Sequence, residues 1–283
     1  MAARRRPAAA VPLPPSDEVR RYLEHLRVER RLAPTTLASV GAALARLESA
    51  AAAHPVALRE VQTHHIRRWA AQLHGEGAAP RSVAIVLSAW RGLYRWWGRE
   101  GGVAMNPADG VRAPKAARPL PKALAVDQAV GLAEHRQPGA DPRLEARDRC
   151  IVELLYGCGL RVAELVGLDA APGAAARGWI DRAEAEAQVL GKGSKRRGVP
   201  IGAAALAALD AWLAQRSTMV RADEPALFVT RTGTRLSASQ VRGRLKARAL
   251  QAGLPTHVHP HMLRHSYASH LLQSSGDLRA VQE

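Results

Sequence analysis

The sequence has few acidic residues and few lysines relative to its arginine content. Its 283 residues include 41 Lys and Arg against 25 Asp and Glu, which gives a formal net charge of +16. Five of the 41 basic residues are lysines, so arginine carries nearly all the positive charge. Residues 1–121 have a net charge of +10 and the remainder of the chain has +6. This distribution predicts a polyanion held along both halves; the alternative is that an Arg-rich composition alone inflates the charge.

Cysteines and long apolar runs are also scarce. Cys150 and Cys158 are the only cysteines, and their spacing fits neither a disulfide framework nor a zinc site. We therefore expect buried free thiols in a cytoplasmic protein, and no metal. No apolar run approaches the length of a membrane span, which argues against a membrane partner. Residues 1–15 are basic and proline-rich without an apolar core, so they predict a disordered leader rather than a secretory signal.

Residues 16–105 are predicted to form a four-helix DNA-binding domain. Apolar residues recur there at helical spacing, in stretches short enough to pack as one bundle. Ser16 is the expected cap of the first helix, and Thr35 or Thr36 that of the second. The four predicted helices cover residues 16–30, 35–53, 63–75 and 81–98.

Arginines on the polar faces of this domain are candidates for DNA contact. Arg67 and Arg68 lie on the third predicted helix, and Arg91 and Arg95 on the fourth. Pairs at these spacings suit a phosphate backbone. Solvated faces with no partner are the alternative for each of them.

Residues 106–121 are predicted to be an extended linker. They include four prolines and no helical period. The segment is basic, with Lys115 as a candidate DNA contact, so it suits a path along a duplex between two basic domains. A simple tether is the alternative.

The second predicted domain covers residues 122–283. Asp141-Pro142 marks the start of an apolar helix that extends to about Gly157. Gly-Cys-Gly at 157–159 permits a sharp turn, and Arg161 then begins a short helix. Because backbone N–H groups at a helix start attract anions, an arginine there suits a phosphate.

A small antiparallel sheet is expected between Trp179 and Ile201. The sequence Gly-Lys-Gly-Ser at 191–194 predicts a hairpin turn that carries Lys192. A lysine, unlike an arginine, can lose its proton in a suitable environment, so Lys192 hints at acid–base chemistry. A basic hairpin tip without a catalytic role is the alternative.

A basic helix is predicted to follow a capping box at Ser237–Gln240. Its expected inward residues are Val241, Leu245 and Leu250. The opposite, outward face is expected to meet the DNA backbone or a groove. The candidate DNA contacts on that face are Arg242, Arg244, Lys246 and Arg248.

His261 and Arg264 lie three residues apart just inside a predicted helix start at Pro260. This spacing places both side chains on one helix face, where they suit an anion. Leu263, Tyr267 and Leu271 form a separate stripe that is expected to be buried. An ordinary exposed polar face is the alternative for the His261–Arg264 pair.

Three segments together resemble tyrosine recombinases of the phage integrase family. They read YGCGLRVAEL at 156–165, GKGSKRR at 191–197 and HMLRHSYASHLL at 261–272. Their order and spacing, with the N-terminal bundle, are similar to the Xer subgroup of the XerC/XerD type, over about residues 17–283. The resemblance implies a mainly α fold: a SAM-like four-helix DNA-binding bundle plus an α+β catalytic domain with a small antiparallel sheet.

The resemblance also implies roles for individual residues. Arg161 and Arg264 would be the two catalytic arginines, with Glu164 in support. Lys192 would be the hairpin lysine and His261 the histidine of the His-x-x-Arg pair. Arginines stabilise charge on the phosphate oxygens through paired donors, the lysine protonates the leaving 5′-oxygen, and the histidine assists proton transfer or positions the phosphate.

Family members attack DNA with a tyrosine that forms a 3′-phosphotyrosyl link, without a cofactor. That tyrosine, and a preceding His or Trp, are expected beyond Glu283, so the chain is predicted to be C-terminally truncated and inactive in cleavage. The alternative is a non-catalytic DNA-binding protein derived from a recombinase.

The resemblance further implies a set of partners and a biological role. The partners are double-stranded DNA, a second related recombinase in a tetramer on that DNA, and a cell-division DNA translocase. The implied role is the resolution of chromosome dimers at cell division.

Overall fold

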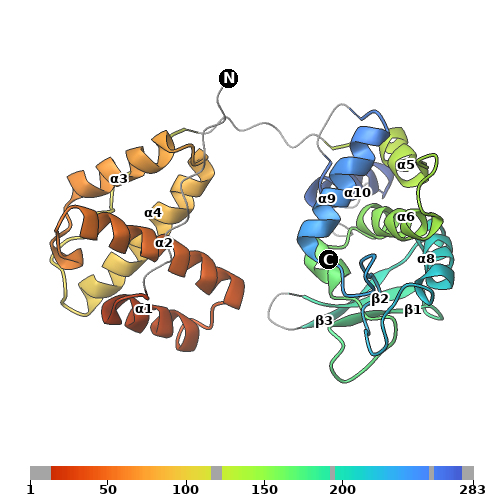
Figure 1. Ribbon diagram of the computed structural model, residues 1–283, viewed down its shortest axis with the longest axis horizontal. Coiled ribbons are helices and arrows are strands. Elements are labelled where there is room, and N and C mark those ends of the chain that lie inside the picture. The colour runs from red at the N-terminus through yellow and green to blue at the C-terminus, as the bar shows by residue number, and fades with distance from the viewer. Residues whose placement is uncertain (1–13, 116–122, 192–194, 255–257, 276–283) are drawn as a thin grey trace. The chain divides into compact units, whose positions relative to one another are not determined.

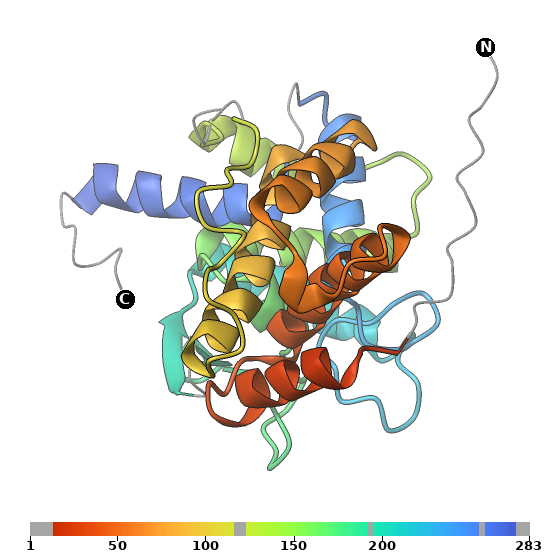
Figure 2. The ribbon, with the colours of Figure 1, turned by 90° about the vertical axis from the view of Figure 1, so that its left-hand side faces the viewer.

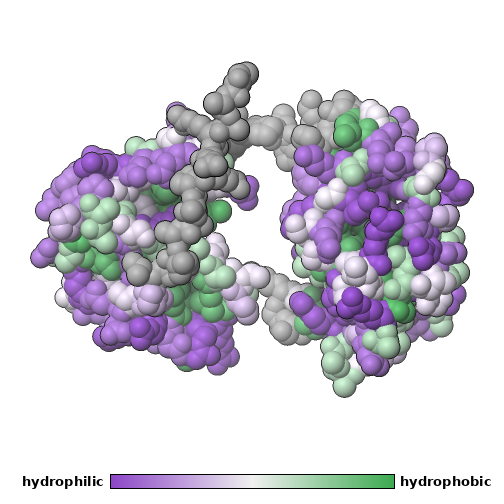
Figure 3. Space-filling view, viewed as in Figure 1, coloured by the Kyte–Doolittle hydropathy of each residue, from purple (hydrophilic) through white to green (hydrophobic). Residues whose placement is uncertain are grey.

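The computed structural model describes residues 14–115, 123–191, 195–254 and 258–275. The chain divides into two compact units, Met1–Arg118 and Pro119–Glu283. Hydrophilic residues predominate on the face of each unit shown in Figure 3, with apolar residues in small patches. Across the described ranges, no helix is both long and apolar enough to cross a membrane.

In the first unit, four α-helices form a bundle within residues 14–115, as the sequence predicted (Figures 1 and 2). A 3₁₀ turn, η1, at Leu58–Glu60 separates its second and third helices. The helices are α1 (Asp17–Val28), α2 (Pro34–Ala53), α3 (Thr63–Gly75) and α4 (Pro80–Arg99).

The helix starts in this unit follow two local rules. The Ser16 hydroxyl accepts a hydrogen bond from the Val19 amide at 3.4 Å, so Ser16 caps α1 as expected. Helices α2 and α4 instead begin at Pro34 and Pro80, whose missing N–H is no loss in a first turn. The expectation that Thr35 or Thr36 caps α2 was therefore wrong, because the helix begins one residue earlier.

Large aromatic side chains fill the bundle core. Trp69, Trp90, Trp97 and Tyr94 are all nearly inaccessible to solvent. The Trp90 indole donates to the Ala43 carbonyl at 2.8 Å, so its N–H is satisfied within the core. The Tyr94 hydroxyl likewise donates at 2.8 Å, to the Leu58 carbonyl in η1. Burial raises the pKa of Tyr94 well above its usual value.

The start of the predicted linker belongs to this bundle. Ala108 and Val111 are buried with the bundle core. The Arg91 guanidinium donates to both of their carbonyls, at 3.4 and 3.1 Å, and the Asn106 side chain donates to the Arg91 carbonyl at 3.1 Å. The expectation of an extended tether was therefore wrong for residues 106–111, because apolar burial and Arg91 fix this segment on α4.

The second unit combines helices with a small sheet. Helix α6 runs through its middle, with the sheet on one side and α5 and α10 on the other (Figure 1). Its helices are α5 (Val126–Glu134), α6 (Pro142–Gly157), α7 (Val162–Val166), α8 (Ala203–Arg216), α9 (Ala238–Gln251) and α10 (Pro260–Ser275). Its strands are β1 (Gly178–Asp181), β2 (Glu186–Leu190) and β3 (Arg196–Pro200).

The sheet is antiparallel in the order β1-β2-β3 among the described residues, which confirms the expectation of a small antiparallel sheet. Val189 pairs with Gly178 on one side and Arg197 on the other, which fixes the register. Ala187, Val189 and Val199 are buried on the face that meets the helices. Because side chains alternate along a strand, Arg197 lies on the same face of β3 as Val199.

Both cysteines are buried free thiols in this unit, as predicted. Cys150 lies on α6 among core leucines, and burial raises its pKa well above the ordinary value. Cys158 caps the C-terminus of the same helix, and burial raises its pKa to about 12. Both thiols therefore stay protonated and unreactive in the folded protein.

Candidate phosphate-binding site

Gly159 forms the turn between α6 and α7. Its φ is +59°, in the left-handed region that favours glycine. A Cβ added there would lie 2.4 Å from Cδ1 of Tyr267, so the α10 tyrosine ring packs directly on this backbone. The sharp turn that the Gly-Cys-Gly sequence predicted is thus made at Gly159. Gly157 is still helical and has no such contact.

Arg161 and Glu164 form a closed pair at the start of α7. Arg161 is the N-cap residue, and Glu164 Oε2 accepts a hydrogen bond from its amide at 2.8 Å. Glu164 Oε1 accepts from the Arg161 guanidinium at 2.9 Å. The Arg161 side chain remains 51% exposed, whereas that of Glu164 is 5% exposed. The pair therefore holds a guanidinium at the surface above a buried carboxylate.

Arg197 supplies a second guanidinium to the same carboxylate. It comes from β3, and its NH2 group lies 3.1 Å from Glu164 Oε1. Burial alone would raise the pKa of Glu164, but hydrogen bonds from Arg161 and Arg197 outweigh burial and hold this pKa below its ordinary value. The sequence reasoning did not single out Arg197 as a separate site residue. Its position two residues before the inward-facing Val199 was the available signal.

Arg264 reaches the same region from α10. Its guanidinium donates to the Gly159 carbonyl, in the turn just before Arg161. Burial lowers the pKa of Arg264, the positive charges of Arg161 and Arg197 lower it further, and Glu164 opposes them. The structure therefore brings together Arg161, Glu164 and Arg264, three residues that the sequence identified from separate segments.

His261 is exposed on the first turn of α10. Its neighbour His259 accepts a hydrogen bond from the Met262 amide at Nδ1, at 3.2 Å, which caps the helix start. Burial and the nearby His261 lower the pKa of His259, so the capping ring is favoured in its neutral form. His261 and Arg264 are on the same helix, but no hydrogen bond joins them among the described contacts.

Lys192 lies outside the described residues. The described flanks of its loop are β2, which ends at Leu190, and β3, which begins at Arg196. The Gly191 amide donates to the Lys195 carbonyl at 2.8 Å. The described residues on either side of Lys192 therefore belong to the antiparallel pair β2 and β3.

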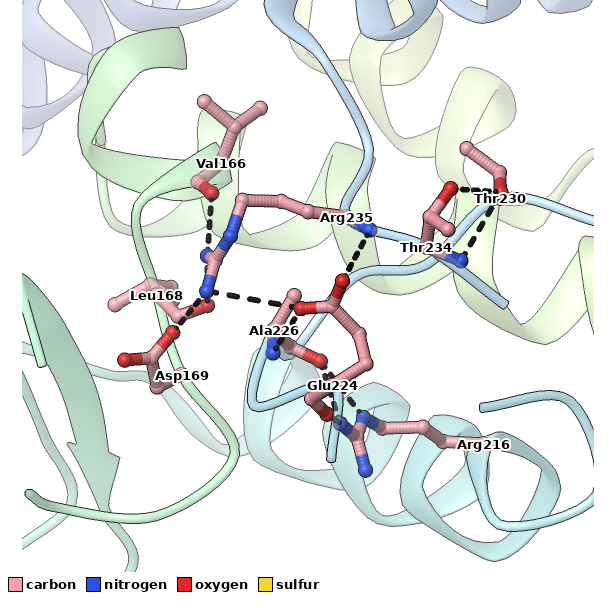
Figure 4. Close-up of polar contacts among 9 residues, drawn as sticks. All are labelled: Val166, Leu168, Asp169, Arg216, Glu224, Ala226, Thr230, Thr234 and Arg235. Carbon is pink, nitrogen blue, oxygen red and sulfur yellow. Dashed lines mark hydrogen bonds and ion pairs between the residues drawn. The ribbon is translucent and has the colours of Figure 1, made fainter. Parts of the chain in front are cut away.

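A polar network holds the other end of α7 (Figure 4). The Arg235 guanidinium donates to the carbonyls of Val166 and Leu168, at 2.9 and 3.1 Å, and also binds Asp169. Glu224 accepts a hydrogen bond from the Arg235 amide at 2.9 Å. Sequence reasoning missed this network, because its members are scattered over about 70 residues without a motif. It anchors the C-terminal end of the helix that begins at Arg161.

The basic residues that the sequence proposed as DNA contacts fall into three groups. Two of them have structural partners within the protein: Arg91, whose guanidinium binds the carbonyls of residues 108 and 111, and Arg248, which is buried. Arg244 is half exposed and pairs with the buried Asp148 at 2.6 Å. The exposed candidates, which stay predictions, are Arg67, Arg68, Arg95, Lys115, Arg242 and Lys246.

Arg248 was expected to face outward but is buried, with 4% of the residue exposed. Its guanidinium donates to the Leu132 carbonyl at 2.8 Å, to the Ala133 carbonyl at 3.0 Å and to Glu145 at 2.9 Å. Leu250, expected inward, is 78% exposed. Both expectations were wrong because α9 turns its 248–249 side toward α5, where Arg248 satisfies carbonyls at the end of that helix.

The four tyrosines of the chain all lie in described segments. Tyr22 and Tyr94 are buried in the first unit. Tyr156 places its hydroxyl 3.0 Å from Nδ1 of His270, which joins α6 to α10. Burial raises the pKa of Tyr267, whose ring covers Gly159. Within the described ranges, no group of three or more His, Cys, Asp or Glu side chains is placed to hold a metal ion.

Comparison with known proteins defines the class of this fold and site. Residues 122–283 match the phage integrase family, and residues 19–101 match the phage integrase N-terminal SAM-like domain. The chain therefore belongs to the phage integrase family, the tyrosine recombinases, which cleave and rejoin DNA.

The chain is similar in sequence to several recombinases named XerC. It is 50% identical to tyrosine recombinase XerC 1 of Ralstonia nicotianae, over 96% of this chain and 86% of that protein. Tyrosine recombinase XerC of Pseudomonas aeruginosa is 43% identical, over 93% of this chain and 83% of that protein. This kinship confirms the resemblance that the three motifs suggested.

Solved structures share the fold at low identity. XerH recombinase bound to a palindromic difH substrate has a TM-score of 0.68 at 18% identity, over 92% of this chain and 74% of that one. A lambda integrase dimer bound to a core site has a TM-score of 0.67 at 16% identity, over 94% and 92%. The arrangement of elements is thus the one found in DNA-bound members of the family.

Proposed function

We propose that the protein is a site-specific DNA recombinase that cuts and rejoins duplex strands through a 3′-phosphotyrosyl intermediate. The observation that carries the proposal is the convergence of Arg161 and Arg264 on one turn. Arg264 binds the Gly159 carbonyl, and Arg161 begins the helix two residues later. A scissile phosphate held there would receive guanidinium donors from two separate elements, α7 and α10.

In the proposed step, a tyrosine oxygen bonds to phosphorus and the bond to the 5′-oxygen breaks. Negative charge builds on the non-bridging oxygens, where Arg161 and Arg264 donate. Lys192 supplies the proton that the 5′-oxygen gains, and His261 acts at the proton of the attacking tyrosine. The reverse step, attack by a 5′-hydroxyl, rejoins the strand and conserves the bond energy.

We infer that the attacking tyrosine is none of the four in the described chain. Tyr22 and Tyr94 belong to the core of the other unit. Tyr156 is hydrogen-bonded to His270, and the ring of Tyr267 is packed against Gly159.

The proposed DNA contacts of the two units are electrostatic. Arg67, Arg68 and Arg95 are exposed on the first unit, and Arg242 and Lys246 on α9. Their exposure and like charge support contact of each unit with DNA phosphates. Lys115 lies on the connecting segment and would contact the same backbone.

We propose chromosome dimer resolution as the biological role, because the relatives of highest identity cited above carry the name XerC. The partners would be a second related recombinase, in a tetramer on DNA, and a cell-division DNA translocase. We infer a cytoplasmic location because the proposed substrate is chromosomal DNA.

The test is covalent trapping on a nicked duplex. The protein first selects its binding site from a pool of random duplexes, and the nicked duplex then carries that site. We expect a DNA–protein adduct from the complete polypeptide. Arg161→Ala and Arg264→Ala should each reduce adduct formation by about 100-fold or more while retaining DNA binding. Specific binding without any adduct would instead support the non-catalytic alternative, and unchanged adduct in either variant would contradict the site.

A further inference from the structure

The carboxylate of Glu164 is shared between two guanidiniums. Its Oε1 atom lies 2.9 Å from Arg161 NH1 and 3.1 Å from Arg197 NH2. The side chain of Glu164 is 5% exposed, so this carboxylate is nearly removed from water. A buried carboxylate is retained at low cost only when charged or polar groups satisfy it, and Arg197 is one of those groups.

Arg197 reaches Glu164 from a different element than Arg161. It lies on the helix-facing side of β3, in register with Val189 of β2. The adjacent Arg196 lies on the other face, where its guanidinium is 4.8 Å from the centroid of the Trp179 ring. The alternation of the strand thus sends one of two consecutive arginines to the site and the other away from it.

Arg197 affects how much positive charge Arg161 can present to a phosphate. A carboxylate paired with Arg161 alone would cancel the charge of that guanidinium, because the two groups lie within hydrogen-bond distance. With Arg197 on the same oxygen, one negative charge is divided between two positive ones. Counting Arg264, three guanidiniums and one carboxylate leave a net charge of +2 beside the Gly159 turn.

The three guanidiniums lie close enough to act on one another. Burial lowers the pKa of Arg264, and Arg161 and Arg197 both add to that effect across the site. Of the two arginine side chains that bind Glu164, that of Arg197 is the less exposed, at 28% against 51% for Arg161. Arg197 is therefore the less solvent-accessible of the two guanidiniums on the carboxylate, and Arg161 is the one more available to a ligand from solvent.

We propose that Arg197 is a positioning residue for the phosphate site, acting on the reaction through Glu164 and Arg161. By sharing Glu164, it fixes the carboxylate that orients Arg161, and it preserves the positive charge that Arg161 offers to the phosphate. This role rests on the proposed function, because the group that benefits is the scissile phosphate. Arg197 itself need not touch DNA.

The first test is a double-mutant cycle on Arg197 and Glu164 in the complete polypeptide. Single-turnover cleavage of the trapped duplex is measured for Arg197→Ala, Glu164→Gln and the double variant. We expect Arg197→Ala to slow cleavage by about 10- to 100-fold, less than the loss typical of a direct donor. In the Glu164→Gln background, the same change should slow cleavage by less than about threefold. Equal losses in both backgrounds would overturn the proposal.

The second test separates an electrostatic role from a purely structural one. A methylphosphonate at the scissile position lacks one negative charge, so it needs less positive charge from the site. On this substrate, Arg197→Ala should slow cleavage by a factor at least about fivefold smaller than on the ordinary phosphodiester. A variant that has lost stabilisation of charge on the phosphate must behave in this way. An unchanged loss would mean that Arg197 supports only the fold.

Two further variants serve as controls for these two tests. Arg182→Ala removes an arginine of the turn after β1 that pairs with a different carboxylate, Asp210 of α8, at 2.6 Å. It should cleave at the wild-type rate. Arg197→Lys keeps the charge and should recover part of the rate even if Arg197→Ala folds poorly. A wild-type protein that forms no adduct would refute the proposed function, whereas an active wild type with an Arg197→Ala variant that cleaves at the wild-type rate would refute only this inference.

Discussion

The ring of Tyr267 lies against Gly159 closely enough to leave no room for a Cβ atom. This contact joins α10 to the turn that precedes α7. On the same turn, the Gly159 carbonyl accepts the Arg264 guanidinium, three residues before Tyr267 on α10. One glycine therefore sets the distance between the elements that carry Arg161 and Arg264.

Gly159→Ala should disturb both stability and the site. A side chain at φ +59° is strained, and its Cβ would meet the Tyr267 ring at 2.4 Å. We expect a loss of about 1–3 kcal/mol in the free energy of unfolding, together with reduced adduct formation. Urea unfolding and covalent trapping measure the two effects.

Gly157→Ala is the matched control, because its nearest neighbour is the Glu153 carboxylate at 4.0 Å and its φ is not in the left-handed region. It should be neutral or slightly stabilising. A Gly159→Ala protein as stable as the control would contradict the close packing of Tyr267.

Arg248→Ala should destabilise the fold without changing how DNA binding depends on salt. It would leave the Glu145 carboxylate and the carbonyls at the end of α5 without their donor. Removing one partner of a buried ion pair costs roughly 3–5 kcal/mol. Thermal unfolding should show the loss, and a stability equal to wild type would refute the buried position of Arg248.

Arg242→Ala should behave in the opposite way. Its side chain is exposed on α9, so its removal should leave unfolding unchanged within about 0.5 kcal/mol. We expect weaker DNA binding and a decrease of about 1 in the slope of log affinity against log salt. Fluorescence anisotropy at several salt concentrations measures this slope. An unaltered slope would remove Arg242 from the DNA contacts.

Stability should fall in acid partly through Glu164. The pKa of Glu164 is held below its ordinary value of 4.5, so its contribution is complete above that value and is lost as the pH falls through the lower, folded-state pKa. The difference in unfolding free energy between wild type and Glu164→Gln should therefore shrink from pH 7 to about pH 3. Urea titrations at each pH provide the measurement, and a difference that grows on acidification would show the sign to be wrong.

The thiols of Cys150 and Cys158 should resist alkylation in the native protein. Both are buried, and burial raises the pKa of each, that of Cys158 to about 12. Little reactive thiolate exists at neutral pH. Iodoacetamide labelling followed by mass spectrometry should detect modification only under denaturing conditions, and rapid native labelling would contradict this prediction.

Local sequence patterns determined much of the fold. The bounds of α3 follow its apolar period, and those of α6 follow Asp141-Pro142 at one end and the glycine turn at the other. The capping box at Ser237 also marks α9 correctly. These features succeed because helix starts, turns and amphipathic periods depend on residues within a few positions of one another.

The same reasoning failed where distant residues compete for one position. The burial of Arg248 depends on carbonyls of α5, more than 110 residues earlier. The ordering of residues 106–111 depends on Arg91 and an apolar site on α4. A helical wheel or a proline count contains no information about such partners.

The sequence by itself predicted Arg161, Glu164 and Arg264 as site residues, because each stands in a motif with a recognisable spacing. Only the tertiary structure decided that Arg197 shares the Glu164 carboxylate and that Tyr267 covers the Gly159 turn. The physical reason is distance along the chain: these contacts join β3 and α10 to α7 and the turn before it, across 33 residues in the first case. A carboxylate can be shared between residues so far apart in the chain only after the core has packed.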